Sequence, residues 1–159
     1  MSARRAEERQ HQREGWAEAV PVWHKVKAML PAKVLELLRR DPHEVRVALV
    51  GASEARHKYG NIILRDLVRK GYPVVPVNPS LDEVEGLPCY ADLAAVPGPI
   101  HIVDFVVPPH VARAVTEALT PGLAEVLWYQ PGAYDRPTVT AAQGLGAEVV
   151  AGPCIMVET

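Results

Sequence analysis

The sequence predicts an α/β protein whose strands form one parallel sheet, preceded by an N-terminal helical extension. From residue 44 onward, short runs of apolar, β-branched residues alternate with amphipathic segments of helical spacing. Glycine and proline separate these segments. Strands that alternate with helices are typical of βαβ units with helices on both faces of the sheet. We therefore expect a doubly wound, three-layer arrangement of about five strands in the order 3-2-1-4-5.

Length and composition indicate one folded domain. The chain has 159 residues, of which 48% are hydrophobic and 23% charged, and its formal net charge is −2. This balance favours neither a nucleic acid nor an anionic membrane as partner. The longest apolar run, residues 100–109, is interrupted by His101 and Asp104 and is too short to span a bilayer. The charged N-terminus and the presence of only two cysteines predict a cytoplasmic protein without a disulfide framework.

Residues 1–40 read as a separate arm and helix, and residues 41–159 as the domain proper. Residues 1–15 are almost wholly polar, so we expect them to be frayed or disordered. An amphipathic pattern then predicts a helix that is broken near Pro31 and ends before Pro42. Glutamates interleave with the basic residues, which favours a solvated arm or docking helix over a nucleic-acid contact.

The domain begins with a strand over residues 45–50, whose nearly continuous apolar run stops at Gly51. A helix follows over residues 61–70, with apolar pairs at i,i+4 and Gly71 as its C-terminal stop. A stretch rich in glycine and proline runs through residue 98. The remaining predicted elements are strands 73–77, 100–107, 125–130 and 147–151 and helices 110–119 and 135–145.

Ligands of open parallel sheets bind beyond the carboxyl ends of the strands, at the switch point, which the expected order puts between the first and fourth strands. After the first strand, two glycines bracket a loop that leads into a helix N-terminus, a natural anion site. The loop lacks both the dinucleotide fingerprint and the P-loop motif. Its candidate ligand-binding residues are Gly51, Ala52, Ser53, Arg56, Lys58, Tyr59 and Gly60.

The second strand is followed by Asn78 and Pro79. Enzymes that use NAD usually carry an acidic residue near this point to accept the ribose hydroxyls. The amide of Asn78 does not repel phosphate, so it suits a ligand with a phosphorylated ribose better than NAD. The alternative is an Asx-Pro turn that only ends the strand.

Two further candidate segments follow later strands. Val107 and Pro108 would present an apolar wall on which a flat base can lie, although proline is also ordinary at a helix start. Gln130 would hydrogen-bond an amide or carbonyl at the cleft. Cys154 reads as a small buried hydrophobe rather than a nucleophile. We find no catalytic set and no metal-ligand spacing in the sequence.

Several of these motifs together resemble the small stand-alone CoA-binding proteins, relatives of the CoA-binding domain of the succinyl-CoA synthetase α subunit. The resemblance covers residues 44–158 and includes Val-Ala-Leu-Val-Gly-Ala-Ser at 47–53, Lys-Tyr-Gly at 58–60 and Gly-Tyr-Pro-Val-Val-Pro-Val-Asn-Pro at 71–79. It continues with Gly-Leu-Pro-Cys-Tyr at 86–90, Leu93, Trp-Tyr-Gln at 128–130 and Cys154. The family implies a Rossmann-like fold that binds coenzyme A.

By this resemblance, Ser53, Arg56, Lys58, Tyr59 and Gly60 would meet the phosphates, and Asn78-Pro79 would lie near the adenosine. Val107-Pro108 would line the base or pantetheine, and Gln130 would face the pantetheine end. The chain departs from the family where Gly152-Pro153 replaces Asp-Arg and where Tyr129 replaces an aliphatic residue. The phosphorylated histidine of the synthetase belongs to a second domain, so ligase chemistry is not carried over.

Three functions stay open from the sequence. The first is a CoA-binding or acyl-CoA-binding module that serves as a sensor or carrier and has an unidentified protein partner. The second is an NAD(P)-dependent oxidoreductase. The third is a nucleotide-binding interaction protein with a vestigial pocket.

Overall fold

A computed structural model describes residues 30–159, so the predicted arm and the first part of the predicted helix lie outside the described residues. The chain divides into two compact units, Met1–Leu30 and Pro31–Thr159, and the second contains all the described helices and strands. Helix α2 (Ala32–Leu38) begins directly after Pro31, and Pro42 opens the short 3-10 helix η1 (Pro42–Glu44). Both proline boundaries agree with the sequence prediction.

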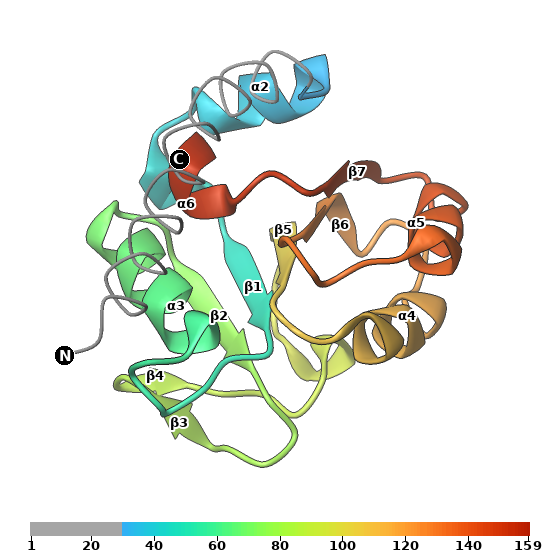
Figure 1. Cartoon of the computed structure of the whole chain (residues 1–159). Coiled ribbons are helices and arrows are strands. Elements are labelled where there is room, and N and C mark those ends of the chain that lie inside the picture. Colours follow the sequence, from blue (N-terminus) through green and yellow to red (C-terminus); the bar gives the residue numbers. More distant parts are fainter. Residues whose placement is uncertain (1–29) are drawn as a thin grey trace, which may run out of the picture. The chain divides into compact units, whose positions relative to one another are not determined.

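Five parallel strands form the central sheet, which confirms the predicted fold class (Figure 1). The strands are β1 (Val47–Val50), β2 (Val74–Val77), β5 (Ile100–Phe105), β6 (Ala124–Tyr129) and β7 (Glu148–Ala151), in the order β2-β1-β5-β6-β7. Every residue of β1 is buried. Its near-continuous apolar run follows from its position between two neighbouring strands and two covered faces.

The predicted strand order was wrong. Counted along the chain, the five strands lie in the order 2-1-3-4-5, because β5 pairs with β1 from Val47↔Ile102 to Val50↔Phe105. The outer edge of β2 is taken by Tyr90, which bridges Val77 and donates its N–H to Pro76 at 3.1 Å. The switch point therefore lies between β1 and β5, not between the first and fourth strands.

Helices cover both faces of the sheet, as Figure 1 shows. On one face lie α3 (Tyr59–Arg69) and α6 (Ile155–Glu158), and on the other lie α4 (Pro109–Glu117) and α5 (Arg136–Gln143). The sequence did not predict α6, the 3-10 helix η2 (Leu93–Ala95), or the hairpin of β3 (Glu83–Val84) and β4 (Leu87–Pro88). The hairpin and η2 fall within the stretch rich in glycine and proline.

Local signals set the helix boundaries close to their predicted positions. Helix α3 ends at Arg69, and Gly71, whose φ is +97°, follows the C-cap residue Lys70. Tyr72 donates its N–H back to the carbonyl of Leu67 at 3.0 Å in a Schellman closure. Helix α5 is capped at its N-terminus by Asp135, whose carboxylate accepts the N–H of Thr138 at 2.9 Å. Among residues 30–159, no helix combines the length and the apolar character needed to cross a bilayer.

Candidate functional site

The segments that follow β1, β2, β5 and β6 meet at the carboxyl edge of the sheet. Asn78 Nδ2 donates to the carbonyl of Ala52 at 2.8 Å, which ties the end of β2 to the loop after β1. The N–H of Gln130 donates to the carbonyl of Phe105 at 3.1 Å, which joins the ends of β5 and β6. The structure thus brings the candidate segments together, while their contact with a ligand stays a prediction.

The two glycines of the first loop are required by close backbone packing. Gly51 has φ of +99°, and a Cβ there would lie 2.2 Å from the carbonyl oxygen of Val106. Gly60 lies in the first turn of α3, where a Cβ would lie 2.0 Å from the carbonyl oxygen of Gly51. Any larger residue at either position must move the backbone, so the glycines hold the start of α3 against the switch point.

Internal hydrogen bonds order the loop of residues 51–60, and its cationic side chains are exposed to solvent. Ser53 Oγ accepts the N–H of Ala55 at 3.1 Å, and the carbonyl of Ser53 accepts from Asn61 Nδ2 at 2.8 Å. Arg56 and Lys58 are exposed, and Tyr59 is 63% exposed. Their side chains flank the N-terminus of α3, where helix N–H groups favour an anion.

A polar network that the sequence did not predict lies beside this loop. The fully buried Asn61 donates through Nδ2 to Glu85 Oε1 at 3.0 Å and accepts from Arg65 Nε at 2.7 Å. Arg56 Nε also donates to Glu85 Oε1, at 3.1 Å. The hydrogen bond from Asn61 and the charges of both arginines hold the pKa of Glu85 below its usual value. The hairpin that carries Glu85 was not predicted, so no sequence signal placed this carboxylate near the loop.

The side chain of Asn78 makes two internal hydrogen bonds. Its Nδ2 clamps Ala52, and its Oδ1 accepts the N–H of Ser80 at 2.8 Å. The second bond is the Asx turn that the sequence offered as an alternative. Pro79 lies exposed within this turn. Asn78 therefore supports the first loop and shapes the end of β2.

Val107 and Pro108 lie in the link between β5 and α4. Val107 is half-buried against the core under α4 and α5, and its Cγ1 would be 2.7 Å from a Cβ at Gly51. Pro108 is the N-cap residue of α4, and Pro109 is its first residue. Val107 thus lies beside the first loop, and Pro108 begins a helix, as the second sequence interpretation has it. Contact of either residue with a base stays a prediction.

Gln130 is buried, with 4% exposure, and its amide group makes internal hydrogen bonds. Its Nε2 donates to Asp104 Oδ1 at 2.6 Å, and its Oε1 accepts the N–H of Ile155 at 3.2 Å. Gln130 thereby ties β5 to the start of α6. The structure gives this residue a scaffold role beneath the site, and a direct contact with pantetheine stays a prediction.

Asp104 is a charged residue type at the centre of the sheet. It is fully buried, and its Oδ2 has no hydrogen-bond partner among the described residues. Burial raises the pKa of Asp104 to about 7, although the hydrogen bond from Gln130 acts against the shift. Burial also raises the pKa of the Cys154 thiol. Cys154 is half-buried rather than buried, and its role stays a prediction.

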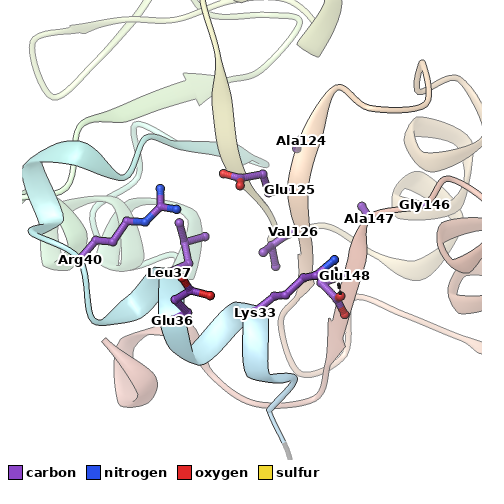
Figure 2. Close-up of a pocket in the computed structure, with 10 residues that line it drawn as sticks. All are labelled: Lys33, Glu36, Leu37, Arg40, Ala124, Glu125, Val126, Gly146, Ala147 and Glu148. Atoms are coloured by element: carbon purple, nitrogen blue, oxygen red, sulfur yellow. Dashed lines mark ion pairs between the residues drawn. The ribbon is translucent and has the colours of Figure 1, made fainter.

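A cavity of about 360 Å³ lies at the opposite end of the strands (Figure 2). It is formed by α2 together with the beginnings of β6 and β7. Lys33 and Glu148 line it and face each other across 3.9 Å. The cavity is separate from the carboxyl edge, so it is not part of the candidate site.

The comparisons with known proteins agree with this architecture. The chain is 29% identical over 126 residues to the uncharacterized protein YneT of Bacillus subtilis, covering 79% of this chain and 91% of that protein. It is 30% identical over 120 residues to an ADP-forming acetate–CoA ligase of Archaeoglobus fulgidus, covering 69% of this chain and 17% of the ligase. A solved structure of a conserved hypothetical protein of Pyrococcus furiosus has 43% identity and a TM-score of 0.66. That match covers 72% of this chain and 99% of the other.

A family model provides the assignment. The model described as "CoA binding domain" matches residues 45–159, which include every strand of the central sheet and the whole candidate site. Its start coincides with the change from the N-terminal segment to the first buried strand. The chain therefore belongs to the CoA-binding domain family, within a Rossmann-like α/β fold.

Proposed function

We propose that this chain binds coenzyme A at the carboxyl edge of its sheet, with the phosphates against the loop of residues 51–60. The observation that carries the proposal is the exposed pair of cations, Arg56 and Lys58, on a loop packed against the start of α3. Guanidinium, ammonium and helix N–H groups are the donors that phosphates take in proteins. The donor set therefore fits a ligand that carries several phosphates.

The remaining groups suit the other parts of the ligand. Asn78 and Pro79 would lie beside the adenosine, where an amide accommodates a phosphorylated ribose. Val107 and Pro108 would offer an apolar wall to the base or pantetheine. Gln130 would set the pantetheine end indirectly, because its hydrogen bonds to Asp104 and Ile155 hold β5 and α6 in place.

Calorimetric titration of the full chain with CoA and with NAD tests the proposal. We expect CoA to bind with an affinity on the order of micromolar, about −8 kcal/mol, and NAD to bind more weakly. A native mass spectrum of the purified protein would show whether a ligand with the mass of CoA or an acyl-CoA is retained. Tighter binding of NAD than of CoA would contradict the proposal.

A further inference from the structure

The turn between β3 and β4 holds a glutamate where the backbone favours another residue. Glu85 and Gly86 form the two-residue turn and have φ of +49° and +78°. Such turns are dominated by asparagine, aspartate and glycine, since longer side chains rarely adopt the left-handed conformation. Glu85 is the one non-glycine residue with positive φ among residues 30–159.

The carboxylate of Glu85 reaches across to the candidate phosphate loop. Its Oε1 accepts from Arg56 Nε at 3.1 Å and from Asn61 Nδ2 at 3.0 Å. Arg65, which donates to Asn61 Oδ1, adds a second positive charge nearby. The side chain of Arg56 is 67% exposed and that of Glu85 is 29% exposed, so the pair lies at the surface, open to a competing anion.

A carboxylate and a phosphate are recognised by the same guanidinium groups. Glu85 is ionised at neutral pH, because the contacts with Asn61 and the arginines lower its pKa. In the ligand-free chain, the Arg56 guanidinium therefore already has an anionic partner. A ligand phosphate can bind the whole Arg56 guanidinium only if the Glu85 carboxylate leaves it.

We propose that Glu85 is a built-in competitor for the phosphate subsite, so that CoA binding displaces its carboxylate from Arg56. This inference rests on the proposed function. Glu85 limits the affinity of the site, and its release couples ligand binding to the position of the β3–β4 hairpin. The opposite role, in which Glu85 holds Arg56 in its binding position, predicts the opposite effect of substitution.

Titration of the full chain with CoA separates these roles. Glu85→Gln keeps an acceptor for Asn61 but removes the charge, so it should raise CoA affinity about three- to tenfold at low salt and less at high salt. Glu83→Gln, an exposed carboxylate of the same hairpin, is the matched control and should leave the affinity unchanged. Glu85→Asn suits the turn backbone and should also raise the affinity, which guards against misfolding of the first variant.

Each outcome has a definite meaning. If the wild-type chain binds CoA but Glu85→Gln binds it equally or more weakly, the competitor role is overturned and the proposed function stands. If Glu83→Gln gains as much affinity as Glu85→Gln, the effect is one of overall charge, and the role is overturned as well. If neither the wild type nor any variant binds CoA, the proposed function and the inference both fail.

Discussion

Two polar networks of similar construction lie in different environments. In each, an amide side chain joins a carboxylate to the backbone of a neighbouring segment: Asn61 joins Glu85 to Ser53, and Gln130 joins Asp104 to Ile155. At the surface, donors and positive charges lower the pKa of Glu85. In the core, burial raises the pKa of Asp104 to about 7. The surface Asn61–Glu85 network is therefore the one that we propose exchanges partners with a ligand, and the buried Gln130–Asp104 network is the one that fixes the scaffold.

Removing the buried amide should have the largest effect. Gln130→Ala leaves Asp104 Oδ1 and the N–H of Ile155 without their partner inside the protein. We expect the free energy of unfolding to fall by about 3 kcal/mol. Arg56→Ala, which breaks an exposed ion pair, should change it by less than about 0.5 kcal/mol. Denaturant unfolding measures both, and equal losses would contradict the contrast between the networks.

Stability should depend on pH through Asp104. Its pKa rises from 3.8 to about 7 on folding, so the folded chain binds the proton more tightly than the unfolded chain. The stabilisation is complete below pH 3.8, declines as the pH rises toward 7 and is lost above it. From pH 5 to pH 8, the free energy of unfolding should fall about 2–3 kcal/mol further in the wild type than in Asp104→Asn. Parallel pH profiles would contradict an uncharged buried Asp104.

Asn78→Asp tests the clamp that the Asn78 side chain places on the loop of residues 51–60. The new carboxylate would face the carbonyl of Ala52 in place of an N–H donor. We expect a loss of about 1–2 kcal/mol in unfolding free energy and about tenfold in CoA affinity. The affinity for dephospho-CoA, which lacks the 3′-phosphate, should fall less than the affinity for CoA. Equal losses of affinity for CoA and dephospho-CoA would contradict the placement of the adenosine beside Asn78.

Lysine substitutions at the two ends of the sheet should have the smallest effect, which is on CoA affinity alone. Lys58→Ala should weaken CoA binding about tenfold at low salt without changing stability, because an exposed lysine beside phosphate acts through its charge. Lys33→Ala is the matched control, since Lys33 is equally a surface lysine but lies on α2 at the opposite cavity. Titration of both variants with CoA provides the comparison. Normal binding by Lys58→Ala would make Lys58 a plain solvated charge.

The sequence was informative where local chemistry decides structure. Each strand of the sheet and each of the longer helices of the domain were predicted within a few residues, because their hydrophobic periods and end signals are local. The strand order was not predicted correctly, because it depends on which edge of the sheet a strand later in the chain joins. Pro76 lies inside β2 and has no N–H to donate to a neighbouring strand. Proline within a strand is typical of an edge strand, which argues against a position of β2 in the interior of the sheet.

Site prediction had the same limit. The loop of residues 51–60 could be proposed as a ligand site because its glycines and cations are contiguous in sequence. Glu85 was missed because it reaches Arg56 only through a hairpin of two-residue strands, too short to show a period. Asp104 did leave a signal: a carboxylate inside an apolar run that reads as a buried strand must be either neutral or partnered.

Amide hydrogen exchange with and without CoA distinguishes binding at the carboxyl edge of the sheet from binding elsewhere, because one experiment reports on residues 51–60, the β3–β4 hairpin and the opposite cavity. We expect protection on CoA addition in residues 51–60, with a change in the β3–β4 hairpin as Glu85 leaves Arg56. Residues 32–38 and the starts of β6 and β7, which line the opposite cavity, should exchange as before. Protection confined to that cavity, with none in residues 51–60, would contradict CoA binding at the carboxyl edge of the sheet.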